Sequence, residues 1–236
     1  MPEVIRPSTV LPANRRLFTI TTADHLKLIG EVATPIGERV ASILCLHPNP
    51  TGGGMMDSHI YKKAANRLPH MAGIEVIRFN TRGTASEQGK SEGEYGATIT
   101  EQLDVEAALN YSFNDLKVEK LFIVGWSFGT ELALKWARDL RIAGLILLSP
   151  PMKYTTQRDL DFWRKDGRAI TALIPEFDEY LNPEAARSTF TNMPNLNLIE
   201  VTEGKHLWVG EPQVHRVLTE ITKVVAPSKL PLATEI

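Results

Sequence analysis

The stretch LFIVGWSFGTELALKWA, residues 121–137, decides the expected fold of this chain. An apolar run leads into Gly125-Trp126-Ser127-Phe128-Gly129, and a helical pattern follows it. A short apolar run bounded by glycine is typical of a buried strand. The sequence therefore predicts a strand that ends at the glycines and a helix that begins directly after them, with a serine at the junction.

Apolar runs of strand length recur along the chain, between segments with helical patterning. Their apolarity is continuous rather than alternating, which is typical of strands buried on both faces of a parallel sheet. The six runs are VASILCL (40–46), IEVIRFN (74–80), KLFIVGW (120–126), GLILLSP (144–150), AITALIP (169–175) and NLNLIEV (195–201). Ahead of them, RRLFTITTADHLKLIGEVATP (15–35) predicts an antiparallel hairpin that turns near Ala23-Asp24-His25.

Four further segments have helical patterning. The first offers Asp57 and Ser58 as N-caps, and the second has Thr98 and Glu101 at the spacing of a capping box. The segments are 57–70, 98–113, Phe128–Leu140 and 211–225, the last with Pro212 in its first turn. The tail, 226–236, is expected to be loose.

Strands that alternate with helices predict an α/β fold. We expect a mostly parallel, doubly wound sheet with a leading antiparallel hairpin and helices on both faces. No repeat, low-complexity tract or linker divides the chain. We therefore expect a single domain over residues 1–236, with only a short insert at about 151–168 between two predicted strands.

The composition argues against several classes of protein. Lysine and arginine number 26 and acidic residues 28, a net charge of -2, so we expect no nucleic-acid partner and no membrane partner. The single cysteine, Cys45, rules out an internal disulfide and is expected to be a small buried residue. Neither a signal-peptide core nor an apolar run of about 18 residues is present, so we expect a cytoplasmic protein.

Ser127 stands at the carboxyl edge of the predicted sheet, where reactive groups gather in folds of this kind. Gly125 and Gly129 lack a Cβ, so the chain can turn sharply and the helix can approach the strand closely. The turn exposes the serine hydroxyl, and the N–H of Phe128 lies at a helix start, where negative charge is favoured. These features predict a nucleophile elbow, G-x-S-x-G. The alternative is a glycine-bounded turn with an incidental serine.

A serine hydroxyl is a weak nucleophile near neutral pH and needs a base that an acid orients. His206 follows the last predicted strand in a short glycine-bounded loop at the carboxyl edge, and we predict that it is the base. His47 ends a strand at the same edge but precedes Ser127, so a loop-shaping role is expected. The other four histidines have expected surface or packing roles: His25, His59, His70 and His215.

The acid is expected after a strand that lies between Ser127 and His206 in the chain. Asp178, three residues after the predicted strand ends, is the preferred candidate. Glu176 and Glu179 are the alternatives, and a solvated acidic loop is the other interpretation of this segment. A buried aspartate here would accept the N–H of His206, fix its tautomer and stabilise the imidazolium that forms.

The oxyanion of an acyl-transfer intermediate needs two hydrogen-bond donors. One is the N–H of Phe128, the residue after the nucleophile. The second is expected from HPNPTGGGMMD (47–57), in which the two prolines have no N–H. Asn49 is therefore the nearest donor and Thr51 the next, and the three glycines would let the backbone pass close to a substrate.

These residues predict a serine hydrolase that cleaves small carboxylic esters through an acyl-enzyme on Ser127, with no cofactor and no metal. The insert is too short for a full helical cap, so we expect a shallow site that handles short acyl esters better than long-chain lipids. The expected substrate-binding residues are Trp126, Met152 and Trp163, and Phe162 and Tyr154 are further candidates that core packing would explain equally well.

With these residues assembled, the chain resembles the α/β-hydrolase superfamily over nearly its whole length. The chain order Ser127, Asp178, His206 is the order of that fold. More narrowly, the chain resembles a group of small lidless bacterial serine hydrolases with a histidine-proline and glycine segment near the oxyanion site. The matching segments are HPNPTGGGMMD (47–57), RFNTRG (78–83), EQLDVEAAL (101–109), GWSFG (125–129) and GKHLWVG (204–210).

Two positions depart from the pattern of these relatives. The relatives carry a second histidine where this chain has Asn49, which bears on substrate preference. They carry a Gly-x-x-Asp form where this chain has PEFD, which bears on the assignment of Asp178. The resemblance also implies that Arg82 and Asp104 are structural residues, and we expect a buried pair that braces the loops.

Other activities fit the sequence less well. The segment GTASEQGKS (83–91) has five residues between its glycines where a P-loop needs four. No His-x-x-x-His or Cys-x-x-Cys pair indicates a metal site. Two alternatives stay open. One is a non-catalytic binding protein with this fold; the other is thioester hydrolysis, acyl transfer or amide or peptide cleavage by the same three residues.

Overall fold

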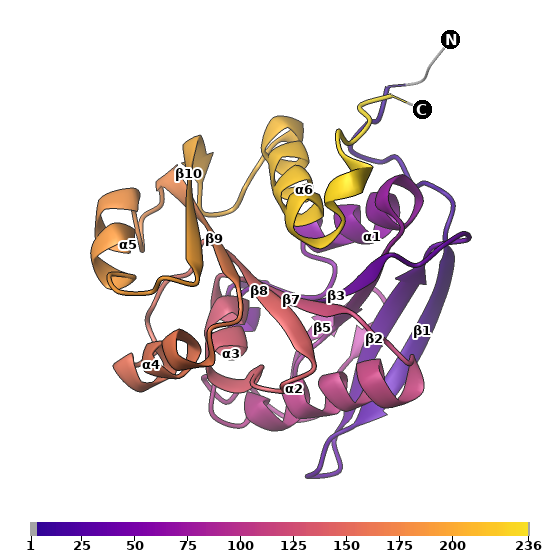
Figure 1. The fold of residues 1–236 in the computed structure, drawn as a ribbon. Helices are drawn as coiled ribbons and strands as arrows, with labels where there is room; N and C mark the ends of the chain where they lie inside the picture. Colours follow the sequence, from indigo (N-terminus) through magenta and orange to yellow (C-terminus); the bar gives the residue numbers. More distant parts are fainter. Residues whose placement is uncertain (1–3, 236) are drawn as a thin grey trace.

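The computed structural model describes residues 4–235. An eight-stranded sheet runs through the molecule in the order β1-β2-β4-β3-β7-β8-β9-β10 (Figure 1). Its strands are β1 (Asn14–Thr21), β2 (Lys27–Thr34), β3 (Ala41–Leu46), β4 (Ile74–Phe79), β7 (Leu121–Trp126), β8 (Ile142–Leu148), β9 (Ile170–Phe177) and β10 (Leu196–Lys205). A separate small ribbon pairs β5 (Ala85–Ser86) with β6 (Gly89–Lys90).

The sheet is antiparallel at one edge and parallel elsewhere. β1 and β2 form the predicted hairpin, with Thr21 opposite Lys27 at its closed end, and β2 runs antiparallel to β4. From β4 to β10 every pair of neighbours is parallel. Every residue of β3, β4 and β7 is buried, which explains their continuous apolar sequences. The predicted fold class is confirmed.

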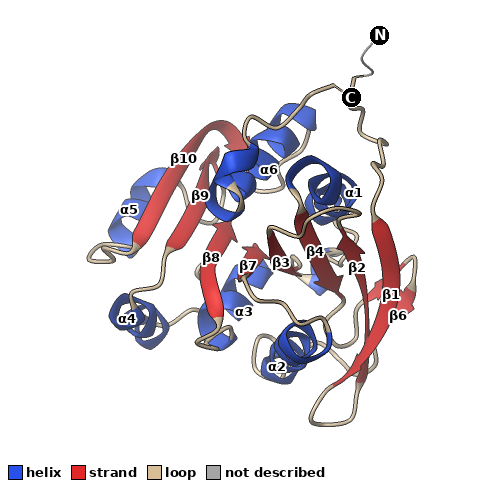
Figure 2. Ribbon diagram, turned by 45° about the vertical axis from the view of Figure 1, so that its right-hand side comes forward, coloured by secondary structure: helices blue, strands red, loops and turns tan. Residues whose placement is uncertain are grey.

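Helices cover both faces of the sheet (Figure 2). On one face, Ile60 and Val217 belong to one apolar cluster, and on the other face Leu109, Leu132 and Leu160 belong to a second. The first face carries α1 (His59–Ala72) and α6 (Glu211–Val225). The second carries α2 (Glu101–Asn110), α3 (Phe128–Trp136), α4 (Gln157–Asp166) and α5 (Pro183–Thr189). The loops after the parallel strands therefore meet at one open edge of the sheet.

Local chemistry moves some boundaries away from those predicted. α2 begins at Glu101 rather than Thr98, because Thr98 has a φ of 79°. The predicted capping box does not form, since Oε1 of Glu101 accepts the N–H of Gly96 at 2.7 Å instead. The helix predicted to reach Leu140 ends at Trp136. α5 and the β5–β6 ribbon were not predicted, because such short elements carry little periodicity.

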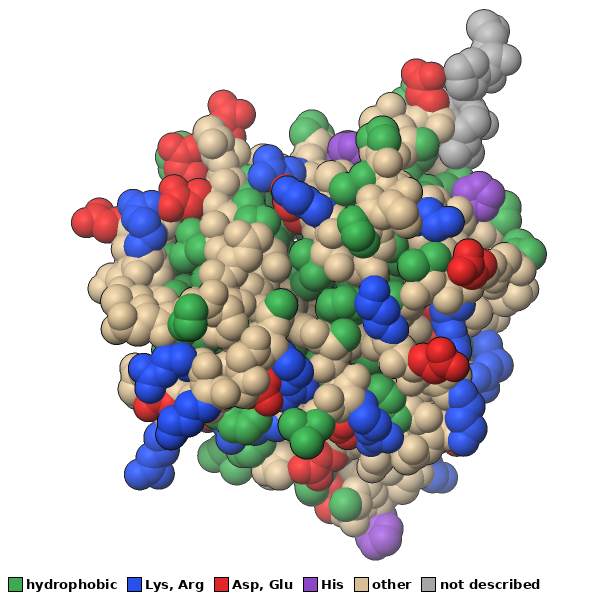
Figure 3. Space-filling model, viewed as in Figure 1, with side chains coloured by type: hydrophobic (Ala, Val, Ile, Leu, Met, Phe, Trp, Pro, Cys, Tyr) green, Lys and Arg blue, Asp and Glu red, His purple; other side chains and the backbone are tan. Residues whose placement is uncertain are grey.

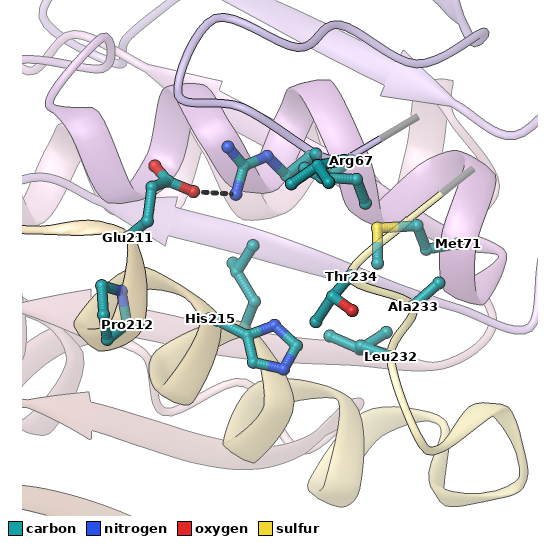
Figure 4. A pocket seen from close by; sticks show the side chains of 11 residues that line it. Arg67, Met71, Glu211, Pro212, His215, Leu232, Ala233 and Thr234 are labelled. Atoms are coloured by element: carbon teal, nitrogen blue, oxygen red, sulfur yellow. Dashed lines mark ion pairs between the residues drawn. The ribbon is translucent and has the colours of Figure 1, made fainter. Parts of the chain in front are cut away.

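The C-terminal tail packs against the body of the protein, contrary to the prediction that it is loose. Leu232 is only 5% exposed. The carbonyl oxygen of Thr234 accepts the N–H of Ile5 at 2.9 Å, so the two ends of the described chain lie side by side. Figure 4 shows the tail beside Met71 and His215, where it closes a cavity of about 260 Å³. The apolar partners of the tail come from α1 and α6, which local sequence does not reveal.

The surface agrees with the balanced composition. On the face drawn in Figure 3, basic and acidic side chains are interspersed. Within residues 4–235, no helix has both the length and the apolarity needed to cross a membrane. Cys45 is 1% exposed in β3, and its burial raises the pKa of the thiol, which fits the predicted role of a small buried residue.

Candidate active site

Ser127 occupies the sharp turn between β7 and α3. Its φ is 51° and its ψ is -118°, a conformation that costs a residue other than glycine about 1–3 kcal/mol. A Cβ on Gly125 would lie 2.5 Å from the carbonyl oxygen of Gly129, and a Cβ on Gly129 would lie 1.8 Å from that of Leu46. Glycine at both positions therefore permits the close approach of strand and helix that places the serine at the open edge of the sheet.

The structure brings Ser127, His206 and Asp178 into one chain of hydrogen bonds. Ser127 Oγ lies 2.8 Å from His206 Nε2, and His206 Nδ1 lies 2.9 Å from Asp178 Oδ2. In the tautomer that satisfies both contacts, Nδ1–H donates to the carboxylate and Nε2 accepts the serine proton. The side chains of His206 and Asp178 are 6% and 1% exposed, so the imidazole and the carboxylate interact away from bulk water.

Asp178 follows β9 directly, because this strand extends two residues beyond its predicted end. Its Oδ1 accepts the N–H groups of Tyr180 at 2.9 Å and of Leu181 at 3.3 Å. These bonds hold the carboxylate in place and leave Oδ2 for His206. Two backbone N–H groups after β9 therefore hold the Asp178 carboxylate in the orientation in which Oδ2 contacts His206.

The two alternative acids lie away from His206. Glu176 Oε2 accepts the N–H of Glu203 in β10 at 2.8 Å, and Glu179 is exposed. Among the three acidic residues of this segment, only Asp178 makes a hydrogen bond with the imidazole. The geometry favours Asp178 as the orienting acid.

Buried donors hold the loop that carries His206. Trp126 Nε1 and Ser149 Oγ both donate to the His206 carbonyl oxygen, each at 3.1 Å. The ring of Tyr180 lies against the imidazole, with the ring centroids 4.7 Å apart. Ser149 and Tyr180 were not predicted, because they reach the histidine from the segments after β8 and after β9 only in the folded chain.

His47 shapes the loop after β3, as the sequence indicated. The buried ring donates from Nδ1 to the Pro48 carbonyl oxygen at 2.7 Å, and its Nε2 accepts the N–H of Thr81 at 3.0 Å. Burial lowers the pKa of His47 to about 4, so the ring is neutral near pH 7. The imidazole therefore ties the loop after β3 to the loop after β4.

Asn49 and Phe128, the predicted oxyanion donors, both lie beside Ser127 and line the same small cavity. Phe128 is the first residue of α3, so its N–H has no acceptor within the helix. Thr51, the alternative donor, gives its N–H to Asn49 Oδ1 at 3.1 Å. This arrangement is compatible with Asn49 and Phe128 as the two donors, and that role stays a prediction.

Two cavities meet at Ser127. The smaller has a volume of about 120 Å³, and the larger has a volume of about 310 Å³. Both are lined by Ser127, Asn49 and Tyr180. The larger cavity adds His206, Trp126, His59, Leu207, Val209 and the loop 52–54, whereas the smaller adds Tyr95, Phe128, Glu131, Pro151, Lys153 and Tyr154.

Two of the predicted substrate-binding residues lie outside both cavities. Trp163 is 0% exposed and its Nε1 donates to the Leu134 carbonyl oxygen at 2.8 Å, so it is a core residue. Met152 is half-buried against the same apolar cluster and lines neither cavity, and Phe162 also packs there. α4 turns its apolar side to the core, so it supplies no lining residue. Trp126 does line the larger cavity.

Tyr95 and Glu131 line the smaller cavity and were not predicted. Tyr95 lies in the irregular segment before α2, where no pattern marks a site. Glu131 is in the first turn of α3, where an acidic residue is ordinarily explained by the helix dipole. Its spacing of four residues from Ser127 places both on one face of the helix, which is the signal that could have identified it.

Arg82 and Asp104 form the buried pair that the resemblance implied. The backbone N–H and Nε of Arg82 donate to the Asp104 carboxylate at 2.8 and 2.9 Å, and Nη2 donates at 2.8 Å. The side chains are 5% and 0% exposed. Arg82 also donates to Asp24 in the β1–β2 turn, at 3.0 and 3.2 Å. The guanidinium therefore braces the loop after β4 against both α2 and the hairpin.

No group of three or more histidine, cysteine, aspartate or glutamate side chains within residues 4–235 could hold a metal ion. The segment 83–91 forms the β5–β6 ribbon rather than a loop that opens a helix, so the structure gives no support to a P-loop.

Comparison with known proteins agrees with this geometry. The sequence profile of the alpha/beta hydrolase fold family matches residues 42–171. An uncharacterised protein of Rickettsia prowazekii is 29% identical over 138 residues. That alignment covers 58% of this chain and only 56% of the relative, so the chain spans little more than half of the relative's length.

Several solved structures share the fold over almost the whole chain. A serine hydrolase homologue of Coxiella burnetii has a TM-score of 0.73 at 22% identity, covering 93% of this chain and 99% of its own. A lidless serine hydrolase of Xanthomonas campestris has a TM-score of 0.72 at 22% identity, covering 96% and 100%. An esterase of Pyrococcus furiosus has a TM-score of 0.70 at 18% identity, covering 97% of each chain. At these sequence identities, the similarity shows a shared fold and not a shared activity.

This chain belongs to the α/β-hydrolase fold family. The family match extends from β3 into β9 and so includes the serine turn. His206 lies beyond the matched segment, and the structure places it beside Ser127, as the sequence predicted.

Proposed function

We propose that this protein is a serine hydrolase that cleaves small carboxylic esters through an acyl-enzyme on Ser127. The observation that carries the proposal is the buried chain of hydrogen bonds from Ser127 Oγ through His206 to Asp178. A strained serine at a helix start, within hydrogen-bonding distance of a histidine imidazole, is the arrangement that acyl transfer needs.

The proposed reaction has two steps. His206 Nε2 takes the Ser127 proton as the hydroxyl attacks the ester carbonyl, and Asp178 stabilises the imidazolium. The N–H groups of Phe128 and Asn49 hold the oxyanion. His206 then protonates the leaving alcohol, and water cleaves the acyl-enzyme by the reverse sequence. The reaction needs no cofactor, because the three side chains supply the nucleophile and all proton transfers.

An ester is preferred to a thioester or an amide because a structural neighbour from Pyrococcus furiosus is described as an esterase. The helix α4 contributes no residue to either cavity, which supports a short ester rather than a long-chain lipid. Thioester hydrolysis, acyl transfer and peptide or amide cleavage by the same three residues are the alternatives that substrate profiling separates.

The first experiment is the intact mass of the purified protein after treatment with a fluorophosphonate, beside Ser127→Ala. One adduct on the parent and none on the variant supports the proposal, because only an activated serine reacts with this reagent. Hydrolysis of 4-nitrophenyl butanoate by the parent, lost in the variant, then establishes ester cleavage. A folded parent that neither forms an adduct nor hydrolyses the ester would identify a non-catalytic binding protein with this fold.

A further inference from the structure

The two cavities at Ser127 differ in one respect that bears on the substrate: only the larger one includes His206 in its lining. His206 must protonate the leaving alcohol, so the alcohol oxygen has to lie within hydrogen-bonding distance of His206 Nε2. The acyl chain leaves the carbonyl carbon in another direction, because a tetrahedral centre holds its substituents apart. The alcohol therefore belongs in the larger cavity and the acyl chain in the smaller.

From this division we infer that the protein is selective for esters of a short acyl group and a bulky apolar alcohol, with Tyr95 and Tyr154 as the end of the acyl cavity. The inference rests on the proposed function. It adds that the acyl group is restricted in size and the alcohol is not, and it names the residues that determine each preference.

The acyl cavity is small. Its volume of about 120 Å³ is far below the roughly 300–1,000 Å³ of drug-sized ligand pockets. It equals about four water volumes at about 30 Å³ each, which suits a butanoyl chain. Tyr95 packs on the residue after the nucleophile, with ring centroids of Tyr95 and Phe128 5.4 Å apart. The exposed Lys153 also lines this cavity, so the space beside it offers a longer chain little further apolar burial.

The wall that carries Tyr154 is fixed to the helix that carries Ser127. Glu131 Oε1 accepts the N–H groups of Lys153 at 2.5 Å and Tyr154 at 3.1 Å, and Oε2 accepts the Thr155 hydroxyl. Lys135 Nζ donates to the Tyr154 carbonyl oxygen at 3.1 Å. Glu131 is 0% exposed. The backbone of Tyr154 is therefore held from both sides by α3, and the cavity cannot widen without breaking buried hydrogen bonds.

Tyr95 and Tyr154 both line the acyl cavity, and burial raises the pKa of the Tyr95 hydroxyl. Each ring takes up space beside the cavity, so removing either ring opens space there for a longer acyl chain.

The alcohol cavity is larger and its rim is apolar. Leu207 and Val209 are 53% and 73% exposed beside His206, where they are available to cover an apolar ligand. The Trp126 indole forms another wall, with the His59 ring 5.3 Å from it between centroids. A Cβ placed on Gly52 or Gly53 meets no atom within 4 Å, so the glycine loop leaves room on the opposite side.

The test measures kcat/KM for two ester series, with unfolding followed in parallel. The acyl series is the 4-nitrophenyl esters of acetate, butanoate and octanoate. The alcohol series is the butanoates of ethanol, hexanol and cyclohexylmethanol, alcohols of similar acidity. The parent is expected to prefer butanoate to octanoate, and hexanol or cyclohexylmethanol to ethanol.

Two variants should then separate the cavities. Tyr154→Ala raises the octanoate-to-butanoate ratio about tenfold, as expected if about two more methylenes are buried, and leaves the alcohol ratios unchanged. Val209→Ser lowers the hexanol-to-ethanol ratio about threefold and leaves the acyl ratios unchanged. Ile36→Ser, a substitution at a remote residue that is 68% exposed, changes neither series.

Tyr95→Ala repeats the acyl test from the other ring if Tyr154→Ala does not fold. The inference is overturned if the parent prefers octanoate to butanoate, or if the two variants exchange their effects. It is also overturned if folded variants change neither the octanoate-to-butanoate ratio nor the hexanol-to-ethanol ratio. The proposed function would still stand in all three cases. A parent with no Ser127-dependent turnover of any ester overturns the function and the inference together.

Discussion

The backbone of Gly129 lies directly against that of Leu46: a Cβ built on Gly129 would stand 1.8 Å from the Leu46 carbonyl oxygen. This contact joins α3, the helix after Ser127, to β3, the strand that leads to the loop 47–57. Because both contacting atoms belong to the backbone, no change of rotamer can relieve the overlap that a side chain would create.

Gly129→Ala is therefore expected to destabilise the fold by about 3 kcal/mol or more, the upper range for overpacking. Gly37→Ala is the matched control, since a Cβ there meets no atom within 4 Å, and its effect should stay within about 0.5 kcal/mol. Urea unfolding of the three proteins measures both values. Equal midpoints for Gly129→Ala and the parent would show that strand and helix are not in this contact.

Asn49→Pro is expected to lower kcat about 10²–10³-fold, because proline removes the N–H that we assign to the oxyanion. The φ of Asn49 is -55°, close to the value that proline fixes, so the backbone can keep its course. Asn49→Ala loses the same side-chain contacts with Thr51 but retains the N–H. The ratio of kcat in the two variants isolates the donor, and similar rates in both would remove Asn49 from the oxyanion site.

Asp178→Asn should lower kcat about 10⁴-fold without unfolding the protein, because an amide in this position favours the wrong tautomer of His206. Glu176→Gln and Glu179→Gln, made in the same segment, should keep most of the activity, since neither carboxylate makes a hydrogen bond with the imidazole. Steady-state kinetics of the three variants with one ester substrate measure kcat. If Glu176→Gln or Glu179→Gln lost more activity than Asp178→Asn, that glutamate would be the orienting acid instead.

Asp104→Ala should lower the free energy of unfolding by about 3–5 kcal/mol, because it leaves the buried Arg82 guanidinium without its main partner. Glu87→Gln breaks the Lys62–Glu87 pair, whose side chains are 43% and 73% exposed, and should cost less than about 1 kcal/mol. Chemical denaturation of the two variants gives the comparison. If Asp104→Ala were as stable as Glu87→Gln, the bracing role of the pair would be wrong.

The buried His47 should make the free energy of unfolding depend on pH in the acid range. Its pKa falls on folding from about 6.5 to about 4, because the buried ring is desolvated, so between these values the unfolded chain binds the proton more readily. The contribution is intact above about pH 6.5 and is lost as the pH falls toward 4, by about 3 kcal/mol in all.

Denaturation at pH 7 and pH 4.5 measures this term in the parent and in His47→Gln, whose amide can still donate and accept. The variant should lose less stability between the two pH values than the parent does, whereas His70→Gln, at an exposed histidine, should behave like the parent. A His47→Gln variant with the same acid loss as the parent would assign the effect to other groups.

The sequence predicted most of what depends on local pattern. Continuous apolar runs located the parallel strands, and the two glycines around Ser127 located the elbow, because both follow from constraints between neighbouring residues. The order of Ser127, Asp178 and His206 at strand ends was enough to predict their meeting, since parallel strands end at one edge of the sheet.

The substrate-facing residues could not be predicted in the same way. Trp163 and Met152 were candidates because they lie in the short insert at about 151–168, but apolar side chains of an insert can also pack on the core, and the structure packs both of them there. Tyr95 and Tyr180 have no local pattern, and the only sequence signal for Glu131 is its spacing of four residues from Ser127. They reach the site from segments that only the folded sheet brings together.

The sequence by itself determined the fold class, the strained serine turn and the histidine and aspartate that meet it, because backbone geometry and strand direction limit where these groups can lie. Tertiary structure alone decided the shape of the site. It determines which rings bound the small cavity and which apolar side chains flank the large one. It also determines that Glu131 of α3 holds the backbone of Lys153 and Tyr154 at the small cavity. The physical reason is that cavities are the space left between elements distant in the chain, and no local sequence term specifies that space.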